Sequence, residues 1–328
     1  MDIDLYKLIS KSDLVRISIK KEFRYHVKNK LKNKFGTLKQ ASIELGINFV
    51  TFQNWWLGRR GPLLKDWLNL CKKLDISEDK CFKNIENFYS NNQRYSIMFP
   101  RFREIDEELL AEGVGLYIAE GITSKNSNEI SLSNTDFGVL KFYIKWLEHC
   151  FDIDKNKLNI YVYSHDENFN KNDLIEKWLK KLKVSRINKV YYYKKSTREC
   201  GLIVCSRSIL RYLLNELIIE AKILIKEDKK LAHAYLRGIL AGEGHVYIDK
   251  NRPIRYVEFG LKNKKEIEFI IDLLNMLGIK FSEIEKPNFT NIMICWKKNL
   301  EKLINNGGFG SNEERTLKLI KAYNSYKK

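Results

Sequence analysis

The sequence predicts an α+β fold with two similar halves, preceded by a smaller all-α unit at the amino terminus. The main observation is a glycine-rich apolar motif that occurs twice, about 120 residues apart, as GVGLYIAEG at residues 113–121 and LRGILAGEG at residues 236–244. After each copy, stretches with helical spacing alternate with strand-like stretches. The first ninety residues instead show capping residues followed by helical spacing.

The amino-terminal unit is expected to contain three consecutive helices. Thr37 is a suitable N-cap for a helix over residues 38–45, which Gly46 would end. A second helix is predicted from residue 48 to about residue 56, and an apolar-periodic stretch at residues 63–74 predicts the third.

This helix, tight turn and helix resemble the helix-turn-helix of phage repressors, which implies that residues 1–90 bind DNA. The second helix would enter the major groove and two arginines would lie near phosphates. The residues concerned are Asn48, Phe49, Thr51, Gln53 and Asn54 for the groove and Arg59 and Arg60 for the phosphates. A small helical bundle with a glycine-containing turn is the alternative.

Residues 91–106 are expected to form a basic linker that can lie along a DNA backbone, because polar and basic residues replace the periodic pattern there. Two halves follow, at residues 107–225 and 226–328. We expect each half to run as a helix followed by two strands, a helix, two strands and a helix, the order αββαββα.

The predicted elements can be given in chain order. In the first half they are helix 107–120, strand 129–133, helix 136–151, strand 158–163, helix 172–183, strands 189–193 and 201–205, and helix 208–220. In the second half they are helix 228–243, strands 245–248 and 254–261, helix 264–277, strands 280–285 and 291–296, and helices 298–304 and 312–326.

The two motifs predict helices that pack closely. Gly115 and Ala119 fall on one helix face, as do Gly238 and Gly242, so the two backbones can nearly touch. If the helices are parallel, their last acidic residues, Glu120 and Glu243, emerge side by side, and such a pair can hold divalent cations against phosphate. The alternative is that the motifs form only a packing seam whose acids are ordinary helix-end residues.

Composition favours a polyanionic partner. With 59 Lys and Arg against 41 Asp and Glu, the chain has a formal net charge of +18, which suits a nucleic acid, although a merely basic surface is the alternative. No apolar run is long enough to span a membrane and no export signal is evident, so we expect a cytosolic, cytoplasmic protein with no membrane partner. The six cysteines form no CxxC pair and are expected to be reduced core residues.

The duplicated motif, followed in each half by matching elements, resembles the signature of LAGLIDADG homing endonucleases in their two-motif, monomeric form. The resemblance implies two repeats whose strands form a saddle on double-stranded DNA, and Mg²⁺-dependent phosphodiester hydrolysis. It also implies two or more Mg²⁺ ions bound together with DNA, held by Glu120, Glu243 and the backbone carbonyls of Ala119 and Gly242. A basic residue usually completes such a site, and the candidates at strand ends are Lys194, Lys195, Lys297 and Lys298, of which we select Lys195 and Lys297 as catalytic residues.

Some positions depart from the family pattern. Glu stands at both metal positions, where Asp is commoner, and the first hairpin is expected to be short. Arg237 would be costly in a dry helix seam, so we expect it to point to solvent or phosphate. Because no splicing residues occur at the chain ends, a free-standing endonuclease is expected. The alternatives are a catalytically inactive transcription regulator with the same fold and a helix-turn-helix, and an RNA-binding, maturase-like protein.

Overall fold

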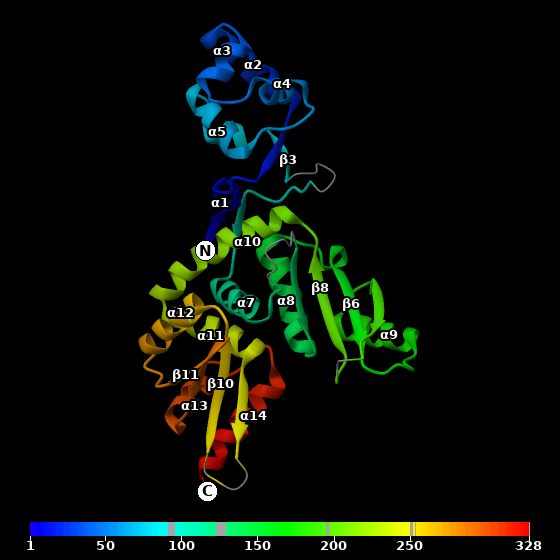
Figure 1. The fold of residues 1–328 in the computed structure, drawn as a ribbon, viewed down its shortest axis with the longest axis vertical. Helices are drawn as coiled ribbons and strands as arrows, with labels where there is room; N and C mark the ends of the chain where they lie inside the picture. The colour runs from blue at the N-terminus through cyan, green and yellow to red at the C-terminus, as the bar shows by residue number, and fades with distance from the viewer. Residues whose placement is uncertain (91–95, 123–128, 195–196, 250–251, 253, 328) are drawn as a thin grey trace. The chain divides into compact units, whose positions relative to one another are not determined.

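The computed structural model describes residues 1–328 except 91–95, 123–128, 195–196, 250–251, 253 and 328 (Figure 1). The chain folds into two compact units. The larger unit contains Met1, residues 104–206 and residues 218–328, and the smaller unit contains residues 2–103 and 207–217. The helix α10 (Ser208–Glu227) contributes residues to both units.

The smaller unit is a set of helices with short strands. In chain order it has β1 (Asp2–Asp4), α1 (Leu5–Ile9), β2 (Arg16–Ile19), α2 (Lys21–Phe35), α3 (Leu38–Glu44), α4 (Phe49–Leu57), α5 (Leu64–Lys73), α6 (Glu78–Phe82), β3 (Ile85–Tyr89) and β4 (Phe102–Glu104). The prediction of an all-α unit was therefore wrong. β2 pairs antiparallel with β3, a strand almost seventy residues further along the chain, and local spacing does not reveal such a pairing.

The three predicted helices of this unit form where the caps indicated. The Thr37 side chain accepts a hydrogen bond from the Gln40 amide, and Gly46 adopts a φ of 66°, which permits the turn. Four buried aromatic rings, those of Phe52, Trp55, Trp56 and Trp67, pack against one another in tilted or edge-on contacts. These rings form the core that fixes α4 against α5.

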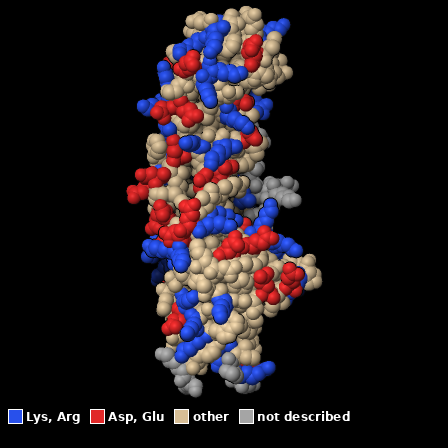
Figure 2. Space-filling view, turned by 90° about the vertical axis from the view of Figure 1, so that its left-hand side faces the viewer, with Lys and Arg blue, Asp and Glu red and all other residues tan. Residues whose placement is uncertain are grey.

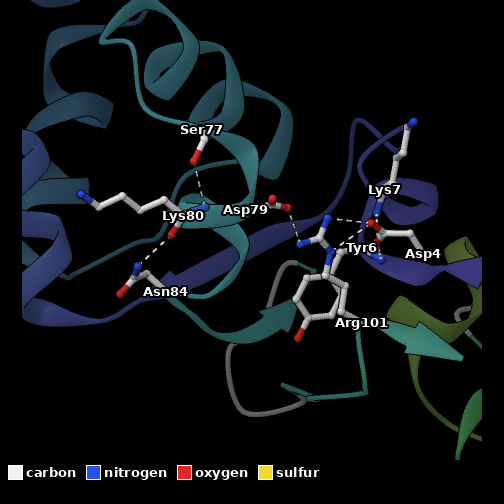
Figure 3. A network of polar contacts seen from close by, with 8 residues as sticks. All are labelled: Asp4, Tyr6, Lys7, Ser77, Asp79, Lys80, Asn84 and Arg101. Atoms are coloured by element: carbon white, nitrogen blue, oxygen red, sulfur yellow. Dashed lines mark hydrogen bonds and ion pairs between the residues drawn. The ribbon is translucent and has the colours of Figure 1, made fainter.

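The predicted basic linker is in part a packed element of the smaller unit. Arg101 forms ion pairs with Asp4 at 2.8 Å and Asp79 at 2.7 Å (Figure 3), and its guanidinium lies over the Phe82 ring, 4.7 Å from the ring centre. Phe99 is buried. Arg101 is thus held by carboxylates of its own unit, and contact of this segment with DNA stays a prediction; residues 91–95 are outside the described part.

The larger unit is built around α7 (Glu107–Glu120) and α11 (Lys229–Glu243), the two helices that carry the motifs (Figure 1). A Cβ atom added to Gly238 would lie 2.0 Å from the Glu112 carbonyl oxygen, and one added to Gly115 would lie 2.1 Å from the Tyr235 carbonyl oxygen. The two contacts are equivalent. Gly238 meets the residue three positions before Gly115, and Gly115 meets the residue three positions before Gly238. The backbones therefore touch, as predicted from the small residues.

The second half of the larger unit has the predicted order. Its four strands form one antiparallel sheet in the order β9-β10-β12-β11, and the inward strand residues Val257, Phe259, Ile292 and Ile294 are buried. The elements are β9 (His245–Ile248), β10 (Arg255–Leu261), α12 (Lys264–Met276), β11 (Ser282–Lys286), β12 (Phe289–Ile294), α13 (Lys297–Asn305), α14 (Glu313–Asn324) and the short 3₁₀ helix η3 (Ser325–Lys327).

The helices and strands predicted one by one for the first half are confirmed, but they do not follow the αββαββα order, which was wrong for this half. Its elements after α7 are β5 (Ile130–Asn134), α8 (Phe137–Phe151), the 3₁₀ helix η2 (Lys155–Lys157), β6 (Asn159–Ser164), α9 (Lys171–Leu182), β7 (Lys189–Tyr192) and β8 (Cys200–Cys205). Helix α9 is a crossover that places β7 parallel to β6, at the edge of a sheet with the order β5-β8-β6-β7. The segment α9–β7 is thus an addition between the two strands that correspond to β11 and β12.

The first hairpin of this half is reduced in the described residues. Gly121 forms a single bridge with Leu132, and the Ile122 amide donates to the Ser131 carbonyl at 2.9 Å. Residues 123–128, between these two segments, are not described. The short hairpin expected from the sequence is therefore seen as a bridge and one further hydrogen bond.

Two further expectations concern the described residues. All six cysteines are free, and four of them are buried. None of the described helices combines the length and apolar character that a membrane span requires.

The helix seam yields a stability prediction. Gly238→Ala places a methyl group against the backbone of α7, so we expect a loss of roughly 1–3 kcal/mol in the free energy of unfolding, less the small gain in helix propensity. Differential scanning calorimetry should show a melting temperature lower by a few degrees. Lys229→Ala, on the exposed start of α11, is the control and should melt like the wild type. Equal melting temperatures for both variants would contradict the seam.

Candidate active site

The two motif helices end at their glycines, but not in the left-handed conformation that is common at helix ends. Gly121 has φ −65° and ψ 134°, and Gly244 has φ −71° and ψ 140°, so the chain leaves each helix in an extended conformation. A Cβ atom on Gly121 would lie 2.3 Å from the Tyr117 carbonyl oxygen. These glycines are therefore required for close approach and let the chain pass directly from helix to strand.

The structure brings the two acids together, as expected. At the end of the seam, a Cβ atom on Gly242 would lie 2.7 Å from both the Ala119 Cβ and the Glu120 Cγ. Glu120 is half-buried, whereas Glu243 keeps a solvent-exposed side. Since both helices run toward this end, the last residue before each terminal glycine faces the same region.

Burial and like charge make the acids reluctant to ionise. Burial, and then the negative charge of Glu243, raise the pKa of Glu120 to about 7. Burial also raises the pKa of Glu243. Arg315 opposes the shift at both acids, and Lys262 opposes it at Glu243.

Two residues that the sequence analysis did not select complete the site. Asn134, at the end of β5, donates from Nδ2 to the Glu120 carboxylate at 3.0 Å, while its own oxygen accepts from the Asp136 amide. Arg315, in the first turn of α14, donates to the Gly242 carbonyl at 2.6 Å. Asn134 lies close to the first motif in sequence. Arg315 lies more than seventy residues after the second motif, and no local pattern indicated its role.

Of the two lysines selected as catalytic residues, the structure describes only Lys297. Lys297 begins α13 and its ammonium lies over the Tyr323 ring, 5.5 Å from the ring centre. Lys195 lies outside the described residues, so its role stays a prediction. The cations that lower the pKa of the acids are Arg315 and Lys262.

Arg237 lies in the seam, contrary to the expectation that it points to solvent or phosphate. Its side chain is only 18% exposed and donates from Nε to the Glu112 carboxylate at 2.9 Å. A second donor reaches the Asn306 carbonyl at 3.2 Å. A buried arginine is tolerated here because a carboxylate and a carbonyl of the same unit satisfy it.

A hollow beside Glu243 provides space for a ligand. Its volume is about 630 Å³, and polar side chains and strand ends line it, among them Glu243, Lys262, Asn263, Glu266 and Asn291. The Ala119 backbone, one of the predicted metal ligands, lies on its rim. A polar hollow of this kind can admit water, ions or part of a larger ligand.

The strand faces that turn away from the helices carry tyrosines. On the first sheet, Tyr163 of β6 stacks on Tyr191 of β7 with ring centres 5.5 Å apart. On the second sheet, Tyr247 of β9 stacks on Tyr256 of β10 at 4.8 Å. The aromatic run at residues 191–193 is 39–50% exposed, so its rings are available for contact with a ligand.

The residues predicted to contact DNA from α4 are not equally placed. Asn48 is the N-cap, and its side-chain oxygen accepts from the Val50 and Thr51 amides, so that oxygen is engaged in the helix end. Exposed positions are Phe49, Gln53, Arg59 and Arg60, whereas Thr51 and Asn54 are partly buried. Figure 2 shows that Lys and Arg side chains on one face of the molecule are interspersed with Asp and Glu.

The donor set at the acid pair suits a hard divalent cation. The carboxylates of Glu120 and Glu243 and the nearby helix-end carbonyls are oxygen ligands, which Mg²⁺ and Ca²⁺ prefer. A divalent cation would also relieve the repulsion that raises the pKa of Glu120. In the described part of the chain, no group of three or more His, Cys, Asp or Glu residues could hold a metal ion, so the site depends on two acids and backbone oxygens.

The chain resembles several proteins of known structure. The chain is similar to full-length DUF199/WhiA from Thermatoga maritima, with 15% identity over 67% of this chain and 61% of that one, at a TM-score of 0.43. It is similar to the N-terminal LAGLIDADG domain of DUF199/WhiA (16% identity, 62% of this chain, 83% of that one, TM-score 0.38) and to I-DmoI in complex with DNA and Mn (15%, 60%, 94%, TM-score 0.34). A search of curated proteins finds no match.

A family model matches part of the chain. Residues 230–308 match the model of the LAGLIDADG-like domain. The match spans α11, including Gly238, Gly242 and Glu243, and continues through the second sheet into the residues after α13. The second half of the larger unit thus contains a LAGLIDADG-like domain, at residues 230–308.

Proposed function

We propose that the protein is a monomeric, site-specific endonuclease that hydrolyses phosphodiester bonds of double-stranded DNA with Mg²⁺. The observation that carries the proposal is the convergence of Glu120 and Glu243 at one end of a glycine-tight helix seam. A pure packing seam gains nothing from two like charges at its end, because each makes the other harder to ionise. The net charge of +18 supports a nucleic acid as the partner.

In this proposal, Mg²⁺ is held by the carboxylates of Glu120 and Glu243 and by the carbonyls of Ala119 and Gly242. When bound, it supplies a Lewis acid and a water of lowered pKa for an in-line displacement at phosphorus. The Asn134 amide keeps the Glu120 carboxylate in one orientation. Glycine-to-backbone contacts along the seam hold the two acids at a fixed separation, which positions the reacting groups.

The strands provide the surface for DNA. Tyr163, Tyr191, Tyr247 and Tyr256 lie on faces turned away from the helices and are suited to packing against sugars and bases. In the smaller unit, the side chains of Gln53, Arg59 and Arg60 are exposed and would make further contacts with DNA.

A second candidate is a DNA-binding transcription regulator that does not cleave. The observation that favours it is the α3–turn–α4 arrangement with its exposed arginines, because a unit of this kind is sufficient to bind DNA without any acid pair. Incubation of a plasmid library with the protein, in Mg²⁺ and in EDTA, followed by sequencing of the ends, distinguishes the two functions.

Removal of either acid should abolish cutting but not binding. Glu120→Gln and Glu243→Gln keep the shape of the side chain and remove a charged ligand, so we expect the cleavage rate to fall by on the order of a hundredfold or more. DNA affinity in a gel-shift assay should be kept or increased, because a negative charge near phosphate is lost. Glu283→Gln, on the exposed strand β11, is the control and should cut like the wild type. Full cleavage by Glu243→Gln would refute the assignment.

The raised pKa of Glu120 predicts a pH-dependent stability in EDTA. The folded protein binds the proton of this acid more tightly than the unfolded chain does, since the pKa rises from 4.5 to about 7. The stabilisation is therefore complete below about pH 4.5 and is lost as the pH rises through about 7. Glu120→Gln should melt above the wild type at pH 8 and close to it at pH 4.5, whereas Glu283→Gln should follow the wild-type profile. A constant difference between Glu120→Gln and wild type at all pH values would contradict this.

The contribution of the smaller unit can be measured by salt dependence. If Arg59 and Arg60 contact phosphates, Arg59→Gln and Arg60→Gln should each lower DNA affinity and reduce the slope of log K against log salt by about 0.9. Lys72→Gln, on α5, is the charge-matched control, and we expect its slope to equal that of the wild type. The Mg²⁺-dependent cleavage position should stay the same in all three variants. An unchanged slope in both arginine variants would exclude these phosphate contacts.

A further inference from the structure

Arg315 occupies the end of helix α11. Its Nη1 donates to three successive backbone carbonyls, those of Gly242 at 2.6 Å, Ala241 at 3.0 Å and Leu240 at 3.4 Å. The residue is fixed in place because Asn312, a buried N-cap, accepts from the Arg315 amide and donates to the Ala241 carbonyl. The start of α14 is therefore attached to the end of α11.

Part of this arrangement is ordinary helix chemistry. The last carbonyls of a helix have no partner within the helix and form its negative end, so a cation is stabilised there. The position is unusual for another reason. The Gly242 carbonyl precedes Glu243 directly, and it is one of the oxygen atoms that the proposed metal site requires.

The two ends of the seam differ in this respect. At the end of α7, the described partner of the acid is the neutral amide of Asn134, which donates to Glu120 itself. At the end of α11, the partner of the backbone is a guanidinium with a permanent positive charge. A charge-assisted hydrogen bond of 2.6 Å is strong, and a divalent ion must replace it to reach the same oxygen.

We propose that Arg315 is a tethered cation that competes with a divalent metal ion for the Gly242 carbonyl. The proposal rests on the metal site proposed above and adds an order of binding to it. The end of α7, with Glu120, accepts a divalent ion while Arg315 stays in place. The end of α11 accepts one only after Arg315 has left the three carbonyls. Arg315 thus acts as a positioning residue that makes the two metal positions unequal.

Binding of Mn²⁺ to the full-length protein without DNA tests the proposal. Titration at pH 8, with free Mn²⁺ measured by electron paramagnetic resonance, should show one ion per wild-type chain. Arg315→Gln should bind a further ion, or bind Mn²⁺ tighter by on the order of tenfold or more, because a full positive charge has left the site. Lys318→Gln removes the same charge one turn further along α14 and should stay within about twofold of the wild type.

The outcomes separate this proposal from the proposed function. If Mn²⁺ binds to the wild type, is lost in Glu120→Gln, and binds Arg315→Gln no better than wild type, the competition is refuted and the metal site stands. If Arg315→Gln and Lys318→Gln improve binding equally, the effect is one of general charge and the competition is again refuted. If neither the wild type nor Arg315→Gln binds Mn²⁺, the metal site and the competition both fail.

A second measurement uses the wild-type protein and does not depend on the folding of a variant. Addition of Mg²⁺ should shift the Nε–Hε resonance of Arg315 in a ¹⁵N correlation spectrum as the guanidinium leaves the carbonyls. The resonance is assigned from its loss in Arg315→Lys. If saturating Mg²⁺ fills two positions and the Arg315 resonance does not move, the proposal is overturned.

Discussion

Backbone contact between α7 and α11 requires that no side chain stand between the two helices, and most of the larger unit depends on this contact. Gly115 and Gly238 each meet a carbonyl of the opposite helix at a distance that excludes even a methyl group. Since backbones are rigid compared with side chains, this contact leaves little freedom in the separation or the relative slide of the helices. Strand β9 follows Gly244 directly, and Gly121 bridges to Leu132 of β5, so the position of each sheet depends on the seam.

Charges along the seam fall into two kinds. In the middle of the helices, Arg237 and Glu112 satisfy each other, and the Glu266 carboxylate of α12 accepts from the Tyr235 hydroxyl and pairs with Lys222. At the end of the helices, two acids face one another and their principal cation is bound to backbone carbonyls. The first kind stabilises the fold, whereas the second stores an unfavourable interaction where a ligand can relieve it. Strained electrostatics of this type are typical of functional sites.

Sequence patterns predicted features that depend on local chemistry. The cap at Thr37, the small residues of the two motif helices, and the order of helices and strands along the second half were all evident from spacing and residue type. Features that depend on distant partners were not. The β2–β3 pairing, the parallel pairing of β7, and the contact of Arg315 with the end of α11 join residues that are far apart in sequence, and Arg237 was misplaced because its partner Glu112 lies on the other helix.

The added segment α9–β7 has a consequence for the symmetry of anything that the larger unit binds. It widens the first sheet by the edge strand β7, which carries Tyr191. The second sheet has β9 instead, whose counterpart in the described residues of the first half is a single bridge at Gly121. A ligand that spans both sheets therefore meets surfaces of different width and chemistry. Turned end for end, it would lose contacts on one side without regaining them on the other, so the two orientations differ in free energy. The larger unit therefore favours one orientation of such a ligand, and a palindromic ligand gains no binding free energy over an asymmetric one.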